Sequence, residues 1–472
     1  MLFMGKSYRS DDLNQSLLLP PSLHDWLPEK HLARFLVDVV EALDLSAIYA
    51  SYEAGDGRGQ SPYAPPMMVR VLLYGYATGT FSSRKIEART FEDVAFRFLS
   101  ADEHPDHCTF AEFRTRHLEA LAGLFMQALQ LCQKAGLVKL GHVAIDGSKL
   151  QGNASKHKAM SYGRMSEAEK KLKDEIEALL KRAAEVDAAE DAKYGKGRSG
   201  DDLPVELARR ESRLAKLQAA KAELEAEARQ KAEEKKAEVE ARIAERHEQE
   251  KRTGKKVRGA EPKKPDPETA TPDATAQRGF TDPDSRIMPD GGNKGAFVQG
   301  YNTQIAVDGA AQVIVAVDVT QQANDRGQLA PMVEQTERNV GARPQAVSAD
   351  TGYWSPAQVE KIQGLGIDLL VATGRQKHGE TSPPVEGEPA QAGDEKSLRE
   401  GMKRKLASPA GRDVYRMRKA IVEPVFGQIK EWRGFRRFSL RGLDKVRGEW
   451  KLVCLTHNLL KLFRSGYVLE AC

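Results

Sequence analysis

Three carboxylates are spaced along this sequence so that they could share a metal ion. Glu423 lies in a segment otherwise rich in cations, and a surface that binds phosphates would repel such an acid unless a metal ion lay between them. Asp146 and Asp350 each follow a short apolar run, which predicts a buried strand with the carboxylate at its carboxyl end. Clustered carboxylates suit Mg²⁺ or Mn²⁺, and a pair of such ions supports in-line phosphoryl transfer.

Cations flank Glu423 on both sides. On a continuous helix, Lys419 and Lys430 would share a face with Glu423, although Pro424 can kink or restart the helix. Arg418 and Lys419 are both candidates for the phosphate contact upstream of the acid, and each could instead pair with the acid within the helix. The predicted DNA contacts of this segment are Tyr415, Arg418, Lys419, Lys430, Arg433, Arg436 and Arg437.

Each acid also has an ordinary structural explanation. Asp146 and Asp350 are of a type that caps turns and helices, and Glu423 could be half of a salt bridge. Asp308 and Asp318 compete for the same site, the first at the end of a predicted hairpin and the second near the end of a strand. Three aromatic residues are candidates to stack on a displaced base, with core packing as their more ordinary role: Tyr353, Trp354 and Trp432.

The elements predicted between these acids follow the order of a ribonuclease-H-like sheet. Without the long insertion, the order is strand, strand, strand, helix, strand, helix, strand, helix. In such a sheet the first and fourth strands are neighbours, so Asp146 and Asp350 come together and the last helix offers Glu423. The expected fold class is therefore α/β, with a ribonuclease-H-like mixed sheet flanked by helices, an all-helical N-terminal domain before it and a coiled-coil hairpin inserted into it.

The chain divides into four predicted parts. Residues 1–138 carry apolar residues at helical spacing, with basic helix ends around a tight turn, which predicts a helical DNA-binding domain or, alternatively, an all-helical packing domain. Residues 139–163 and 279–472 are assigned to the catalytic domain. Heptad spacing over residues 164–250 predicts a coiled-coil helical hairpin with a solvated charged face, and the composition of residues 251–278 predicts a disordered linker.

Composition narrows the class of protein. A length of 472 residues suggests two or three domains, and the net charge of +4 is too small to indicate nucleic acid by itself. The four cysteines form no C-x-x-C pair, which argues against a zinc ribbon or a disulfide framework and fits a reducing cytosol. We expect neither a signal peptide at the start of the chain nor a membrane span, because the apolar runs are too short.

These motifs resemble those of bacterial insertion-sequence transposases with a DDE catalytic triad, which carry a Tyr/Arg/Glu/Lys signature around the glutamate. Asp146-Gly-Ser-Lys resembles the first aspartate motif, Asp350-Thr-Gly-Tyr the second, and Glu423 with Lys430 the third. The sequence departs from the signature at one point, because four residues instead of three separate Arg418 from Glu423. The N-terminal half resembles the helical domain that precedes this catalytic core.

The resemblance implies a function. It implies cleavage of the ends of an insertion sequence and strand transfer into target DNA, with Mg²⁺ as cofactor, Mn²⁺ as a substitute, and Asp146, Asp350 and Glu423 as metal ligands and catalytic residues. DNA, as terminal inverted repeats and target, is the expected partner of a homodimer in the bacterial cytoplasm, associated with the nucleoid when acting. The alternatives are a ribonuclease-H-like nuclease that no longer transposes, a catalytically inert DNA-binding protein, and a coiled-coil scaffold.

Overall fold

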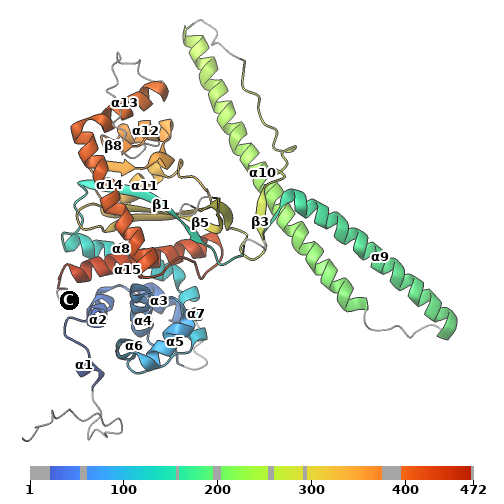
Figure 1. Ribbon diagram of the computed structural model, residues 1–472, viewed down its shortest axis with the longest axis horizontal. Coiled ribbons are helices and arrows are strands. Elements are labelled where there is room, and N and C mark those ends of the chain that lie inside the picture. Colours follow the sequence, from blue (N-terminus) through green and yellow to red (C-terminus); the bar gives the residue numbers. More distant parts are fainter. Residues whose placement is uncertain are drawn as a thin grey trace, which may run out of the picture.

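The computed structural model describes residues 22–53, 61–155, 159–194, 203–253, 260–290, 295–374 and 395–468. Within these ranges the chain forms an α/β body around a mixed sheet, a group of N-terminal helices against that body, and two long helices that project away from it (Figure 1). Every helix in the described ranges is too short or too polar to cross a membrane.

Strand β1 (His142–Gln151) lies at the centre of the sheet. It pairs antiparallel with β5 (Phe297–Asp308) and parallel with β7 (Ala346–Ala349), which confirms the predicted neighbours in a mixed sheet. Three strands complete the sheet: β8 (Asp368–Val371) beside β7, and β4 (Arg286–Pro289) and β6 (Ile314–Thr320) beside β5.

The register of β1 and β7 sets the geometry of the site. Ile145 is the partner of Ala349, so the next residue along each strand, Asp146 and Asp350, reaches the same edge of the sheet. Both strands are apolar and buried up to this point. Strand β7 ends there, whereas β1 continues beside β5 to Gln151, so Asp146 lies within its strand and not at its end as predicted. The parallel pairing of β1 and β7 still makes the two acids neighbours.

Two C-terminal helices hold the sheet. Helix α14 (Pro409–Gly427) crosses β1, β5 and β7, passes through Pro424 and continues into a π-helical turn, η3 (Gln428–Trp432). Helix α15 (Leu443–Arg464) is buried on nearly all sides between β6 and the N-terminal helices, as an apolar sequence of this kind requires. The remaining helices of the body are α11 (Leu329–Val340), η2 (Thr351–Tyr353), α12 (Pro356–Gln363) and α13 (Glu395–Ala407).

The N-terminal helices share a core with the sheet. Helix α8 (Leu118–Lys134) packs along α15 (Figure 1). One continuous cluster of buried apolar side chains runs from these helices into the body. The others are α1 (Leu23–Trp26), α2 (Leu32–Ala42), α3 (Ser46–Glu53), α4 (Pro65–Thr78), α5 (Ser83–Glu92), α6 (Val94–Leu99) and α7 (His107–Arg116).

A buried polar network joins the N-terminal helices to α15. Glu449 is fully buried and accepts hydrogen bonds from the backbone N–H groups of Ser439 and Leu440. The Tyr76 hydroxyl donates to Glu449 over 3.4 Å and accepts from Arg114 over 3.1 Å. Buried polar groups are tolerated only when they are paired, so this network fixes how the two parts meet.

The tight turn after α4, predicted as part of a helix-turn-helix candidate, packs against the body. Gly79 has φ 85°, and a Cβ there would lie 2.6 Å from the carbonyl oxygen of Arg433, so only glycine fits. The Phe81 ring packs edge-on against Phe435 at 4.9 Å. The turn is therefore covered by the C-terminal segment, while basic residues of α5 stay exposed, among them Arg84 and Lys85.

The long helices α9 (Tyr162–Tyr194) and α10 (Leu203–Thr253) run antiparallel and form a projecting arm (Figure 1). Glu169 pairs with Lys221 at 3.0 Å, and Glu175 pairs with Arg210 at 3.2 Å. A separate small core lies along their contact: Met165, Leu172, Leu217, Ala220 and Leu224. We use "the arm" for these two helices; the predicted domain boundaries stay predictions.

The base of the arm is fastened to the sheet. Strand β2 (Ala159–Ser161) pairs with β3 (Gln277–Gly279), and Glu227 of α10 pairs with both Arg278 and Arg286. Part of the region predicted as a disordered linker runs beside α10, where Lys264 contacts Glu240 at 3.3 Å and the carbonyl oxygen of Ala260 accepts from Arg246.

We expect Gly300→Ala to destabilise the protein strongly. Gly300 faces Gln151 across the β1–β5 ladder, and a Cβ at this position would overlap the carbonyl oxygen of Leu150. Because that oxygen belongs to the backbone, the loss should be about 3 kcal/mol or more. Calorimetry should show a markedly lower thermal midpoint.

Gly123→Ala is the matched control, because Gly123 is exposed within α8 and a Cβ there meets nothing within 4 Å. It should raise stability by up to about 1 kcal/mol through helix propensity. Equal midpoints for Gly300→Ala and wild type would contradict the described register.

Candidate active site

Asp146 and Asp350 form the centre of the site. The backbone N–H of Gly147 donates to Asp146 Oδ1 at 2.9 Å, and the N–H of Gly352 donates to Asp350 Oδ1 at 2.8 Å. Each carboxylate is thus oriented by a nearby backbone N–H, which belongs to β1 itself for Asp146 and to the η2 turn for Asp350. The structure brings these two predicted acids together.

Arg418 of α14 reaches into this pair. Its Nη1 lies 3.4 Å from Asp146 Oδ2, and its guanidinium lies 5.9 Å from the centre of the Tyr415 ring. The Tyr415 hydroxyl donates to the carbonyl oxygen of Ala349, directly before Asp350, at 3.4 Å. Arg418 is on the buried face of the helix whereas Lys419 is exposed. Of the two upstream cations, Arg418 is therefore the one that faces the acids.

The acids are held in an environment that disfavours their charge. Burial raises the pKa of Asp146 to about 6; the positive charge of Arg418 opposes this rise, and the negative charge of Asp350 adds to it. Burial also raises the pKa of Asp350, against the hydrogen bond from Gly352. Two oxygen donors in this state suit a divalent cation, which would relieve both desolvation and mutual repulsion.

Glu423 does not stand beside the aspartates. It is exposed on α14, while the face of the helix that meets the sheet carries Arg418, Val422 and Val425. Five residues along an α-helix correspond to a rotation of about 140°, so Arg418 and Glu423 cannot both face the sheet while the helix stays regular. Among the described residues, no group of three His, Cys, Asp or Glu side chains is placed to hold a metal ion.

Lys430 connects η3 to the first aspartate motif. Its Nζ donates to the Ser148 hydroxyl and, at 3.4 Å, to the carbonyl oxygen of Lys149, both on β1. Burial lowers its pKa. The η3 turn thus places Lys430 against β1, two residues along the strand from Asp146. Turns of this π-helical kind are frequent at functional sites.

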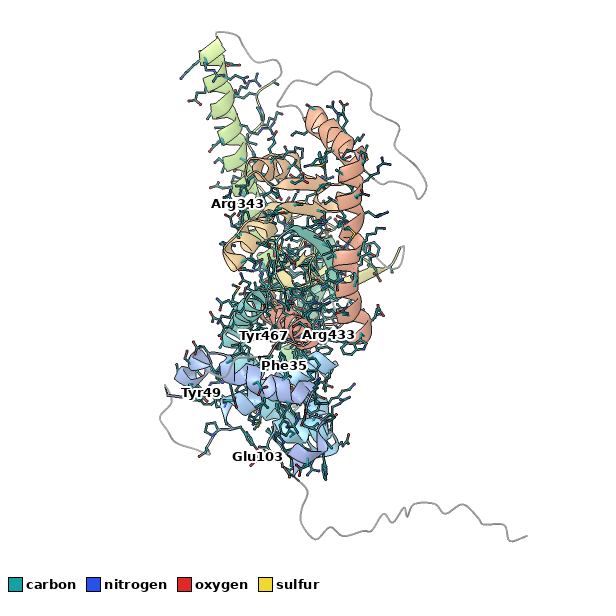
Figure 2. The ribbon with its side chains drawn as sticks, turned by 90° about the vertical axis from the view of Figure 1, so that its left-hand side faces the viewer. Phe35, Tyr49, Glu103, Arg343, Arg433 and Tyr467 are labelled. Atoms are coloured by element: carbon teal, nitrogen blue, oxygen red, sulfur yellow. The ribbon has the colours of Figure 1, made fainter. Side chains whose placement is uncertain are left out.

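Arg433 is a correction to the predicted DNA contacts. Its side chain is buried and its Nη1 donates to the carbonyl oxygen of Val453 and the hydroxyl of Thr456, both on α15. Figure 2 shows Arg433 where the C-terminal helices meet the N-terminal ones. By contrast, Arg436 and Arg437 are exposed beside it in sequence, where Arg436 pairs with Glu431.

The aromatic candidates divide in the same way. Tyr353 and Trp354 are buried in the core, so the packing role holds for them and neither side chain is open to a base. Trp432 is 63% exposed, and the Arg464 guanidinium lies 5.7 Å from its ring centre. Trp432 alone of the three keeps a surface on which a base could stack.

The competing aspartates lie outside the site. Asp308 is buried and accepts backbone N–H groups of Leu140 and Ala310, which is the turn chemistry expected at the end of a hairpin. Asp318 pairs with Arg447 of α15 at 3.2 Å.

One residue near the pair was missed by sequence reasoning. Asp325, in the loop between β6 and α11, lies close enough to Asp146 and Asp350 for its charge to act on both. It follows Ala-Asn in a polar loop and ends no apolar run, so strand periodicity could not have pointed to it.

The mixed sheet, with two acids side by side where β7 ends against β1, is an α/β arrangement consistent with a ribonuclease-H-like DDE domain. Residues 265–459 match the family Transposase DDE domain, and residues 21–116 match the family Transposase domain (DUF772). The chain belongs to the insertion-sequence transposases of the DDE type. Asp350 and Glu423 fall inside the first match, whereas Asp146 lies outside both. Searches of curated proteins and of solved structures found no match.

Membership of the family makes DNA the substrate and indicates an enzyme that cuts and joins it. Enzymes of this type use a divalent metal, and the paired carboxylates described above are chemically suited to one.

We expect the metal-free protein to lose stability as the pH rises through about 6. The folded-state pKa of Asp146 lies above its ordinary value, so the folded protein holds the proton more tightly than the unfolded chain does. The stabilising contribution is present below about pH 4 and is lost above about pH 6, for a total of about 2–3 kcal/mol. Calorimetry in EDTA between pH 4 and 7.5 would measure this fall.

Asp146→Asn should flatten that dependence, while Asp413→Asn, an exposed change on α14, should preserve it. Identical midpoints against pH for wild type and Asp146→Asn would show that Asp146 is not the titrating group.

Proposed function

We propose that this protein cleaves the ends of an insertion sequence and joins them to target DNA by metal-dependent phosphoryl transfer. The observation that carries the proposal is the placement of Asp146 and Asp350 side by side, directly after the last paired residues of two adjacent parallel strands, in a chain of the DDE type. Their carboxylates would hold Mg²⁺, with Mn²⁺ as a substitute. The metal, when bound, supplies activation of water or of a 3′-hydroxyl and neutralises the leaving oxygen.

The remaining groups act on the DNA backbone. Arg418 is paired with the carboxylate of Asp146. We propose that a metal ion bound to this carboxylate displaces Arg418, which then turns to the phosphate beside the cut. Tyr415 keeps Arg418 in place, and Lys430 supports the strand that carries Asp146. Arginine suits this role because its fork of donors matches phosphate oxygens.

Glu423 is proposed as the third ligand. It lies on the same helix as Arg418 but on the exposed side, so completing the triad requires α14 to turn or its regular winding to change. Such a change is least costly at Pro424 within α14 and at the π-helical turn η3, which directly follows α14. Glu423 would join Asp146 and Asp350 only in the DNA-bound enzyme.

DNA recognition is assigned to the N-terminal helices and the basic segment beside them. Arg84, Lys85 and Arg89 are exposed on α5, and the turn before α5 contacts the segment that continues to Arg436 and Arg437. We propose that these surfaces bind terminal inverted repeats next to the active site. They are polar and basic, as phosphate-binding surfaces must be.

Pairing of two element ends requires two protomers. We propose that the arm, a coiled-coil insertion between β1 and β5, contributes to a homodimer formed on DNA in the bacterial cytoplasm, at the nucleoid. Its antiparallel helices stand clear of the body, which leaves their outer faces available to a second protomer (Figure 1).

One observation favours a second function. Because Glu423 lies away from the aspartates, a catalytically inert DNA-binding protein would have this same arrangement. The two functions separate in a cleavage assay.

We expect metal-dependent cleavage of labelled element-end DNA by wild type and a loss of more than about 100-fold in Asp146→Asn, Asp350→Asn and Glu423→Gln. A metal ligand should be worth at least as much as an outer-shell partner, which is typically worth 10–100-fold. Asp318→Asn is the control, since this acid lies outside the site. Equal cleavage by wild type and the three variants would refute the metal mechanism, and DNA binding without any cleavage would favour the inert protein. Joining of pre-cut ends then separates a transposase from a nuclease.

Arg418→Ala and Lys419→Ala should differ sharply in the same assay. Removal of a donor aimed at transition-state charge lowers rates by about 10²–10³-fold, which we expect for Arg418→Ala. Lys419 is exposed and should matter less than about threefold. Single-turnover rates at saturating DNA measure both, with thermal midpoints to confirm folding. A larger loss in Lys419→Ala would reverse the assignment.

A further inference from the structure

Asp325 occupies a position between Gly147, which follows Asp146 in β1, and Gly352, in the turn after Asp350. We propose that it is a positioning residue, which fixes the separation of Asp146 and Asp350 and adds negative charge behind them for a divalent cation. The inference rests on the proposed function and names a residue that the triad does not include. It is carried by three observations: the partners of the Asp325 carboxylate, the glycines beside it, and the charge itself.

The Asp325 carboxylate is held by the strand opposite β1. The side-chain amides of Asn302 and Gln304 on β5 both donate to its Oδ1, each at 2.7 Å. Both amide residues are almost wholly buried. Hydrogen bonds to an ionised acceptor in such surroundings are strong and directional, so Asp325 is fixed relative to the sheet although it lies in a loop.

The same network reaches the second aspartate. The Tyr353 hydroxyl donates to the side-chain oxygen of Gln304, and Tyr353 ends the η2 turn that begins directly after Asp350. On the other side, Gln304 is the partner of Gly147 in the β1–β5 ladder. The side chain of Gln304 therefore links Asp325, through its amide nitrogen, to the η2 turn, through its oxygen, while its backbone faces Gly147 of β1.

Two glycines leave the space that Asp325 fills. A Cβ at Gly147 would lie 2.8 Å from Asp325 Oδ1 and 2.5 Å from Gln304 Nε2, and a Cβ at Gly352 would lie 3.1 Å from Asp325 Oδ2. Gly147 directly follows Asp146, and Gly352 comes two residues after Asp350. The carboxylate of Asp325 thus lies against Gly147 of β1 with Oδ1 and against Gly352 of the η2 turn with Oδ2.

The charge of Asp325 exceeds what its hydrogen bonds need. A neutral amide at this position would also offer Asn302 and Gln304 an acceptor oxygen, without placing a third negative charge beside two others. Like charges this close oppose one another unless a cation is present. The aspartate is understandable if the site is built for a strongly charged cation, which gains from all three carboxylates.

Binding of Mn²⁺ by the metal-free full-length protein tests the inference without recourse to activity. Titration followed by electron paramagnetic resonance should give a dissociation constant about 10–100-fold weaker for Asp325→Asn than for wild type, because outer-shell partners have effects of this size. The thermal midpoint of Asp325→Asn in EDTA should equal or exceed that of wild type. Asp318→Asn, which removes a charge elsewhere in the body, should bind Mn²⁺ as wild type does.

Gly147→Ala is the second variant, because it displaces the Asp325 carboxylate and Gln304 without changing any charge. It should weaken Mn²⁺ binding in the same direction, whereas Gly123→Ala should not. Mn²⁺ binding by Asp325→Asn equal to that of wild type, with Asp350→Asn impaired, would overturn this inference and leave the proposed function standing. Absence of Mn²⁺ binding by wild type would overturn both.

Discussion

Two buried carboxylates on neighbouring strands repel each other and resist desolvation, and the site is organised around that conflict. In this structure the cation that meets them is Arg418, carried by the buried face of α14. A buried acid pair with one guanidinium is not a strong source of stability, since desolvation offsets much of the attraction. Its consequence is positional: the helix must cross the sheet where Arg418 reaches Asp146.

Once α14 is fixed in this way, the segment that continues it determines how the α/β body and the N-terminal helices meet. The helix runs into η3, where Lys430 contacts β1, and then into the segment at Arg433, whose carbonyl oxygen packs on Gly79 of the N-terminal helices. Arg433 is buried because it supports this joint through α15. The site and the N-terminal helices are therefore joined through packed segments, which suits the proposed function, in which the N-terminal helices bind the element end beside the site.

Features signalled by neighbouring residues could be predicted from the sequence, whereas features that depend on contacts between distant segments could not. Apolar runs ending in Asp146 and Asp350 are local signals, and the strand order brought the two acids together as predicted. Arg433 and Arg436 look alike in sequence, yet only the packing of α15 decides that one is buried and the other exposed. Asp325 was missed for the same reason, because its role depends on amides of β5 and on glycines in β1 and in the turn after β7, all distant in sequence. The direction in which Glu423 points depends on its rotation about the α14 axis relative to Arg418. Residue spacing alone does not fix this rotation in a helix that contains a proline.

The arm shows that this geometry does not require a short connection between β1 and β5. Residues 152–296 separate β1 from β5, yet Gln151 still faces Gly300 and the N–H of Gly152 donates to Gln299 at 2.9 Å. Each doubling of a loop raises the closure cost by only about 0.6 kcal/mol, so a long insertion is compatible with the ladder provided that its ends are held together. The β2–β3 pair and the bonds of Glu227 to Arg278 and Arg286 hold them at the base. The register that brings Gln304 opposite Gly147, and with it Asp325 to the acids, is thus independent of what the arm does beyond that base.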